Sequence, residues 1–248
     1  CADRDLHSGI FGGGAWNPIR ILTKILGTLH DETGRVTLPG FYDGVEELPE
    51  AVRASWETLG ATPETLLGPV GLKTPAGEAD HALLEQLWTR PTCDINGISG
   101  GYTGDGFKTV LPARASAKVS FRLVAGQDPE KVREAFRARV REMLPPDATA
   151  AFHPHGGSAG IAIPFDSPWL VKGLDALEAE WNVPAVVLGC GASIPIVGAF
   201  ERLLDMPSLL VGFGLDDDRI HSPNEKYDLE SYHKGTRSWA RIFARLGE

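Results

Sequence analysis

One histidine near the end of the chain, His221, lies in the densest group of potential ligands in the sequence. It follows an apolar run at 208–213 and an acidic run at 216–218, and Glu225 comes shortly after it. The apolar run is short and continuous, which predicts a buried strand, and open α/β sheets bind ligands beyond the carboxyl ends of such strands. His221 is then either a metal or catalytic imidazole oriented by a carboxylate, or a polar loop histidine that caps a turn.

A second candidate, His7, opens a glycine-rich segment in which residues 5–14 read DLHSGIFGGG. Glycines let a backbone turn tightly and approach another chain or a ligand closely. From this spacing, His7 is either a group that acts on a substrate or a turn histidine beside flexible glycines.

Both segments resemble motifs of the M20 family of di-zinc metallopeptidases, the carnosinase-like dipeptidases. Residues 217–226 read DDRIHSPNEK, which is similar to the closing motif of that family, and DLHSGIFGG is similar to the segment that opens its lid, or dimerisation, domain. The resemblance implies that His221 binds one of two zinc ions. It also implies that His7 reaches the active site of the partner subunit in a homodimer, where it stabilises the oxyanion of the intermediate.

A hairpin predicted at 92–124 carries two further candidates, Thr109 and Arg122. Its second strand alternates apolar and polar residues, as a half-buried strand does, so Arg122 could be simply a solvated arginine. The letters KTVLP and VSFRLV around these residues resemble the lid strands of M20 enzymes. The resemblance implies that Thr109 and Arg122 hold the terminal carboxylate of a peptide, a task for which the planar guanidinium is suited.

His155 and Ser193 are candidates in two other loops. His155 lies in HPHGG and is either a linker histidine or, by the register of the motif, an M20 position that contacts substrate near the hinge. Ser193 lies in GCGASIP, which lacks the second glycine of a serine-hydrolase elbow. The M20 resemblance implies that Ser193 and its backbone amides bind substrate, although an alanine here replaces one glycine of the family's pair.

An adjacent glutamate pair, Glu46 and Glu47, has the residue types of the general base and ligand in a di-zinc peptidase. The pair precedes a predicted helix at 49–59 and lacks a glycine-rich strand end. We therefore interpret both residues as acidic groups that favour a helix N-terminus.

The remaining zinc ligands that the resemblance implies are not found in the sequence. M20 sites also use a His-x-Asp motif, and none occurs in the chain. A catalytic zinc needs about three protein ligands and an open position for water. His221 supplies one, and Asp216 or Glu225 would orient its imidazole. We therefore expect two zinc ions in an intact protein of which this chain, starting at Cys1, is an inactive part.

Two domains are predicted, with α/β character overall. Residues 1–156 form an α+β lid with two layers, a mainly antiparallel sheet covered by helices. Residues 157–248 form a βα portion of an α/β catalytic domain. Capping residues followed by proline or acidic residues predict helices that start at Asn17, Asp128 and Asp228.

Other elements follow from apolar patterns. Short strands are expected at 36–41, 148–152 and 185–188, and a helix at 79–88. The last helix places apolar residues three and four apart, and we expect this stripe to be its buried face; it consists of Leu229, Tyr232, Thr236, Trp239, Phe243 and Leu246.

Composition restricts the class of protein. With 42% hydrophobic and 23% charged residues the chain can bury an ordinary core. A net charge of −9 argues against a nucleic-acid partner. No apolar run reaches the roughly 18 residues of a membrane span. The three cysteines have no metal or disulfide spacing, and a reduced, cytoplasmic setting is expected.

The expected function is hydrolysis of dipeptides or short peptides with a free terminal carboxylate, by a homodimer that pairs through the lid. Two other interpretations remain open. One is a non-catalytic dimerisation or binding module, in which the lid serves assembly alone. The other is an M20 amidohydrolase that removes the acyl group from N-acyl amino acids.

Overall fold

The computed structural model describes residues 1–190, 194–215 and 217–248. These residues form two compact units, one built mainly from Cys1–Gly160 and the other mainly from residues 161–248. Helices combine with short antiparallel sheets, which confirms the predicted fold class. The proposed boundary between residues 156 and 157 stays a prediction.

The first unit is organised around one antiparallel strand pair, β2 (Thr92–Gly100) and β4 (Ala115–Arg122). The first residue of β2 pairs with the last residue of β4, and a register shift lies near Gly97. The pair confirms the predicted hairpin. A second, smaller sheet joins β1 (Leu6–His7) to β3 (Val110–Leu111).

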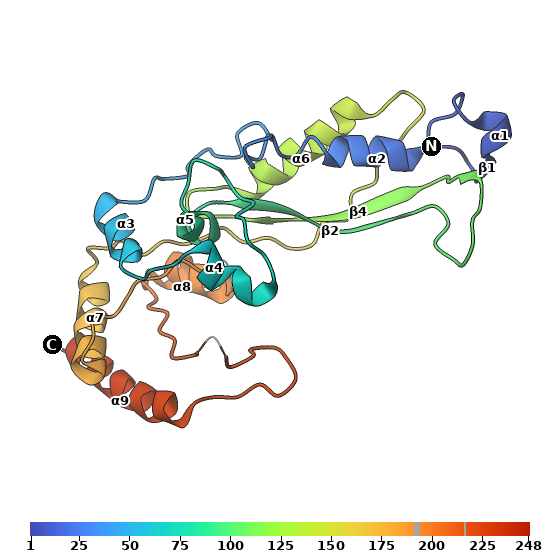
Figure 1. Ribbon diagram of the computed structural model, residues 1–248. Helices are drawn as coiled ribbons and strands as arrows, with labels where there is room; N and C mark the ends of the chain where they lie inside the picture. The colour runs from blue at the N-terminus through green and yellow to red at the C-terminus, as the bar shows by residue number, and fades with distance from the viewer. Residues whose placement is uncertain (191–193, 216) are drawn as a thin grey trace. The chain divides into compact units, whose positions relative to one another are not determined.

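Two helices, α2 (Pro18–Leu26) and α6 (Pro129–Met143), cover one face of the β2–β4 sheet (Figure 1). Both start where the capping signals predicted. The side chains of Asn17 and Asp128 each accept a hydrogen bond at 2.9 Å from the backbone N–H two residues later, and proline occupies the first turn.

The core of this unit lies between the sheet and the two helices. Phe41 and Leu29 are essentially inaccessible to solvent, and the ring of Phe41 lies 5.9 Å from that of Phe121 on β4. Burying such side chains contributes roughly 1.5–3 kcal/mol each. The buried members of the cluster are Leu26, Leu29, Val36, Leu38, Phe41, Cys93 and Val132.

Shorter helices complete the first unit. The predicted helix at 49–59 is present, and the one at 79–88 starts later than expected because residues 79–81 form a turn around a charged cluster described below. The elements are α1 (Ser8–Phe11), α3 (Glu50–Glu57), α4 (Pro63–Leu66), η1 (Gly68–Val70) and α5 (Leu83–Trp88).

The predicted strands at 36–41, 148–152, 185–188 and 208–213 are wrong. In the first unit, Val36 forms only an isolated bridge with His30, and Phe152 packs on the helices from a loop. The other two segments have no regular secondary structure and no partner strand among the described residues. A strand requires a neighbour for its N–H and C=O groups, so an apolar run alone does not make one.

The second unit contains α7 (Pro168–Trp181), α8 (Pro195–Leu204) and α9 (Leu229–Leu246). The helix α9 begins at Asp228 as predicted, because the Asp228 carboxylate accepts hydrogen bonds from two backbone N–H groups at 2.8 and 3.3 Å. No helix among the described residues is long and apolar enough to cross a bilayer.

The predicted buried face of α9 is wrong. Phe243 and Leu229 are well exposed, whereas the buried residues are Ser231, Gly235, Ser238 and Ile242. Small residues on this face let α7 approach closely. Trp181 of α7 donates a hydrogen bond from Nε1 to Ser238 Oγ at 3.0 Å, so this contact lies on the covered side of α9.

Cys93 allows a test of this core. Its side chain is buried on β2, and burial raises the pKa of its thiol to about 12. Since the thiolate is the reactive form, Cys93 should resist alkylation in the folded protein, while the exposed Cys1 and Cys190 should react. Mass spectrometry after iodoacetamide treatment at pH 8 should find two modified cysteines in native conditions and three in urea. Rapid native labelling of Cys93 would contradict this packing.

Candidate functional site

His7 and Thr109 lie next to each other at one end of the first unit. The strand β1, which contains His7, pairs with β3, and the N–H of Ser8 donates to the carbonyl of Thr109 at 3.2 Å. Figure 1 shows β1 and α1 at the end of the β2–β4 ribbon that is distant from α3 and α5. Two predicted site residues are therefore brought together by main-chain pairing.

The imidazole of His7 is oriented by its own turn. The N–H of Gly9 donates to His7 Nδ1 at 3.0 Å. A ring nitrogen that accepts a hydrogen bond carries no proton, so the neutral ring carries its proton on Nε2. The side chain is exposed. His7 thus offers an N–H donor to a molecule that approaches this end of the unit.

Arg122 lies in the other sheet of this unit, at the end of the β2–β4 ribbon that is distant from β1 (Figure 1). It is the last residue of β4, it is exposed, and it pairs with Thr92. Seven steps along β4, from Ala115 to Arg122, span about 23 Å at the rise of a strand. A dipeptide extends only roughly 7 Å. Within one chain, therefore, Arg122 and Thr109 do not reach the same small substrate.

His221 lies in a loop of the second unit that is held together by Asp218. Asp218 is buried, with 1% of its surface exposed, and it accepts hydrogen bonds at 2.8 Å from the N–H of Leu215 and from Lys226 Nζ. The pKa of Asp218 is lowered most by the hydrogen bond from the Leu215 N–H and next by the one from Lys226. His221 and Glu225 are exposed, and His221 has a left-handed φ of 63°.

Sequence reasoning missed Asp218. The sequence favoured Asp216 or Glu225 as the carboxylate that orients His221, whereas burial in the structure distinguishes Asp218. Asp216 and Ser193 lie outside the described residues, and their assignments stay predictions. His155 is exposed in a segment without regular structure, and its role also stays a prediction.

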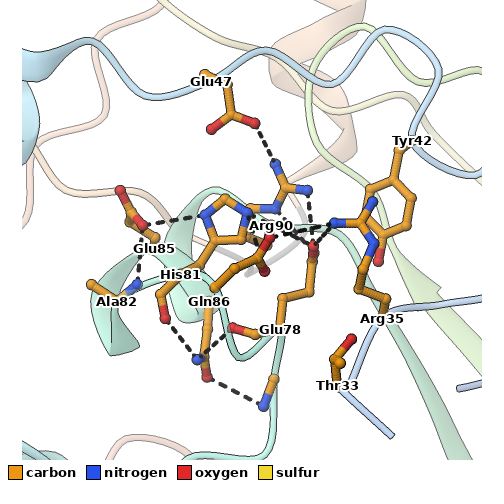
Figure 2. Close-up of polar contacts among 12 residues, drawn as sticks. Thr33, Arg35, Tyr42, Glu47, Glu78, His81, Ala82, Glu85, Gln86 and Arg90 are labelled. Carbon is orange, nitrogen blue, oxygen red and sulfur yellow. Dashed lines mark hydrogen bonds and ion pairs between the residues drawn. The ribbon is translucent and has the colours of Figure 1, made fainter. Parts of the chain in front are cut away.

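A charged cluster on the segment leading into α5 brings three potential metal ligands together, Glu78, Asp80 and His81. Figure 2 shows Glu78 and His81 with Arg35 and Arg90 beside them. One ligand atom of each lies within 4.8 Å of the others. The carboxylate of Glu78 is already paired. Arg90 donates to its two oxygens at 3.0 Å each, and Arg35 donates to one of them at 2.9 Å.

His81 lies between two buried carboxylates. Its Nδ1 is 3.3 Å from Glu85 Oε2, and its Nε2 is 3.8 Å from Glu78 Oε2. Glu85 accepts further hydrogen bonds from Arg53 at 2.6 Å and from the N–H of Ala82 at 3.0 Å. Arginine remains charged in proteins, so a metal ion would meet strong repulsion here. The cluster has the chemistry of a salt-bridge network, although its residue types suit a metal.

Glu47 belongs to the same network. Its carboxylate lies 3.5 Å from Arg90 Nη1, and α3 begins only at Glu50. The interpretation of Glu47 as a residue of a helical first turn is therefore wrong, because Arg90 attracts it instead. Glu46 is exposed beside it.

The described residues do not form a two-metal centre. Among them, the group at Glu78 is the one set of three neighbouring His, Cys, Asp or Glu ligands, and His221 is not in it. A single exposed imidazole cannot fix the geometry of a zinc ion.

Comparison with known proteins identifies the family. Residues 1–148 match the model of the M20 peptidase dimerisation domain. The chain belongs to this family. Over 238 residues it is 32% identical to the Cys-Gly metallodipeptidase of Candida albicans, a match that covers 94% of this chain and 49% of the relative. It is 28% identical to the human Beta-Ala-His dipeptidase, covering all of this chain and 50% of that protein.

Solved structures agree with the M20 assignment. An M20 family metallo-carboxypeptidase from Sulfolobus solfataricus superposes with a TM-score of 0.83 at 29% identity, over 97% of this chain and 55% of that one. Human carnosine dipeptidase 1 gives a TM-score of 0.72 at 26% identity, over 99% of this chain and 52% of that one. The M20 chain described here thus spans about half the length of the relatives it matches.

The network around Glu85 predicts a pH dependence of stability. Burial alone would raise the pKa of Glu85, but hydrogen bonds from Arg53, Ala82 and His81 outweigh it and lower the pKa. The folded protein then binds fewer protons than the unfolded one, so this stabilisation is complete above the unfolded pKa, about 4.5, and is lost as the pH falls through the folded pKa. Glu85→Gln should lower the free energy of unfolding by about 1–2 kcal/mol at pH 7, a value reduced because Arg53 is partly exposed.

Urea unfolding at pH 7 and at pH 3.5 checks this prediction, since the difference between Glu85→Gln and the unmodified chain should shrink at the lower pH. Glu50→Gln is a matched control, because Glu50 contacts the same Arg53 at 3.0 Å from an exposed position. Equal effects of the two substitutions at pH 7 would rule out a special contribution of Glu85.

Proposed function

We propose that this chain is the lid and the carboxyl-terminal catalytic portion of a di-zinc dipeptidase. The substrates would be dipeptides or short peptides with a free terminal carboxylate. The observation that carries the proposal is the separation of His7 and Thr109 from Arg122 along β4. Relatives described as dipeptidases support it.

This separation has a direct explanation in a homodimer. If two lids pair about a two-fold axis, the end of one lid that carries His7 and Thr109 can lie beside the catalytic site of the other protomer. Isologous two-fold pairing is the commonest assembly of identical chains. Arg122 would then serve its own protomer's site, and each site would be completed by the partner.

The roles of the residues follow from their chemistry. The Nε2–H of His7 would donate to the oxyanion that forms on the scissile carbonyl, since such a donor acts most strongly where charge develops. Thr109 of one protomer and Arg122 of the other would hold the terminal carboxylate, Arg122 through two parallel hydrogen bonds. His155 and Ser193 would contact the substrate.

Two zinc ions, when bound, would polarise the carbonyl and lower the pKa of a bound water. His221 would supply one ligand, and Asp216 or Glu225 would orient its imidazole. Asp218 would act indirectly by holding the loop in shape. The other ligands and the general base would come from outside the described residues, because these contain no second set of ligands near His221.

Two alternatives are weighed by the same test. A deacylase of the M20 family would act on N-acyl amino acids, and a non-catalytic dimerisation module would act on neither class. The dipeptidase descriptions of the relatives favour peptides.

For the compartment we propose the cytoplasm, since three free cysteines are compatible with a reducing environment.

Subunit complementation tests the proposal in the full-length protein. His7→Ala and Arg122→Ala should each lower kcat/KM for dipeptides by at least about 100-fold, in line with loss of an oxyanion donor or of a bidentate contact. If the two residues serve the same site from different protomers, mixing and reassociating the variants should restore about a quarter of the unmodified activity. That fraction follows because half of the dimers are mixed and each has one intact site.

Thr236→Ala replaces an exposed residue of α9. This variant is the control for any activity lost during dissociation and reassociation of the subunits. Absence of recovery on mixing would show that His7 and Arg122 act within one protomer. Activity on N-acetyl amino acids but not on dipeptides would favour the deacylase, and inactivity on both would favour the binding module.

The chain alone should bind zinc weakly and should not hydrolyse dipeptides. One exposed histidine with neighbouring carboxylates does not form a closed tetrahedral site. Equilibrium dialysis with zinc and a panel of dipeptides checks both expectations. Stoichiometric zinc that survives a chelator, together with turnover that His221→Ala abolishes, would disprove this division of the active site.

A further inference from the structure

The loop at 101–109, between β2 and β3, has a defined shape. It turns at Gly101 and Gly106, whose φ angles of +75° and +81° favour glycine. The hydroxyl of Tyr102 donates to the carbonyl of Asp105 at 2.8 Å and braces the turn. The charged end of Lys108 lies 5.9 Å from the centre of the Tyr102 ring.

This loop presents Phe107 to solvent. Its side chain is 91% exposed, the highest fraction among the large apolar side chains recorded as exposed in the described residues. Tyr102 is also half exposed, and both aromatic residues line a hollow of about 210 Å³. Single exposed apolar side chains are common on protein surfaces, but Phe107 is set in a braced turn beside a hollow, where its ring offers a large apolar contact area to another molecule.

The position of Phe107 ties it to the candidate site. It precedes Thr109 by two residues, and the carbonyl of Thr109 is hydrogen bonded to the segment that carries His7. If His7 and Thr109 lie in the partner subunit's active site, the loop that holds Phe107 must lie beside that site as well.

We infer that Phe107 is a specificity residue that contacts the side chain of the substrate's C-terminal amino acid in the partner subunit's site. The inference rests on the proposed function. The C-terminal residue is specified because Thr109, two positions away, is assigned to the terminal carboxylate. A phenyl ring offers apolar area and no hydrogen bond, so it favours substrates that end in a large apolar residue. Lys108 and Tyr102 position the loop and are not assigned a contact.

Kinetics of the full-length protein test this assignment with Ala-Leu, Ala-Phe and Ala-Gly. Phe107→Ala should lower kcat/KM for Ala-Leu and Ala-Phe about tenfold relative to Ala-Gly, mainly through KM, because binding to an apolar surface is lost. Phe107→Leu should restore most of the preference. Val70→Ala, which truncates another exposed apolar side chain of the lid, is the matched control and should leave the ratios unchanged.

Sedimentation at the assay concentration distinguishes contact of Phe107 with the substrate from contact of Phe107 with the partner subunit. The inference is overturned if Phe107→Ala lowers kcat/KM equally for all three peptides, if it changes none of them, or if the variant sediments as a monomer. An unmodified protein that hydrolyses none of the peptides would overturn the proposed function together with this inference. Altered ratios in a dimer with unchanged Ala-Gly turnover support it.

Discussion

The pairing of β2 with β4 is the constraint on which the first unit depends. Its backbone hydrogen bonds set a rigid ribbon, and α2 and α6 cover one face of that ribbon with a single apolar core (Figure 1). The ribbon's length then sets the functional geometry. At one end of the ribbon, Arg122 is the last residue of β4 and the charged network lies just before β2 in the chain. The segments that carry His7, Phe107 and Thr109 lie at the other end. A small substrate that contacts both ends would require two protomers, as proposed above.

The network around Glu78 shows why residue type does not establish a metal site. Glu78, Asp80 and His81 have suitable donor atoms at suitable distances, yet two guanidinium groups already neutralise the central carboxylate (Figure 2). A buried carboxylate needs a partner for its charge, and an arginine that meets both oxygens provides it without any ion. In this lid the cluster supports the turn into α5.

The second unit follows a different principle, close approach of small residues. Glu180 on α7 accepts hydrogen bonds from Arg237 and Arg241 at 2.6 and 2.9 Å, and these arginines lower its pKa. The ring of Trp181 stacks on that of Phe213 at 6.0 Å. The helix α9 therefore turns its serines and glycine toward α7, and its large apolar side chains remain exposed.

The sequence by itself determined the local features of this protein. Capping residues set the starts of α2, α6 and α9, alternation set the hairpin, and short motifs singled out His7, Arg122 and His221. These features are encoded within a few neighbouring residues. Only the tertiary structure decided which aspartate is buried, which face of α9 is covered, and how far Arg122 lies from Thr109. Each of these features depends on contacts between groups that are distant in the chain. No local sequence pattern contains such contacts, so only the folded structure determines burial, strand pairing and the distance between sites.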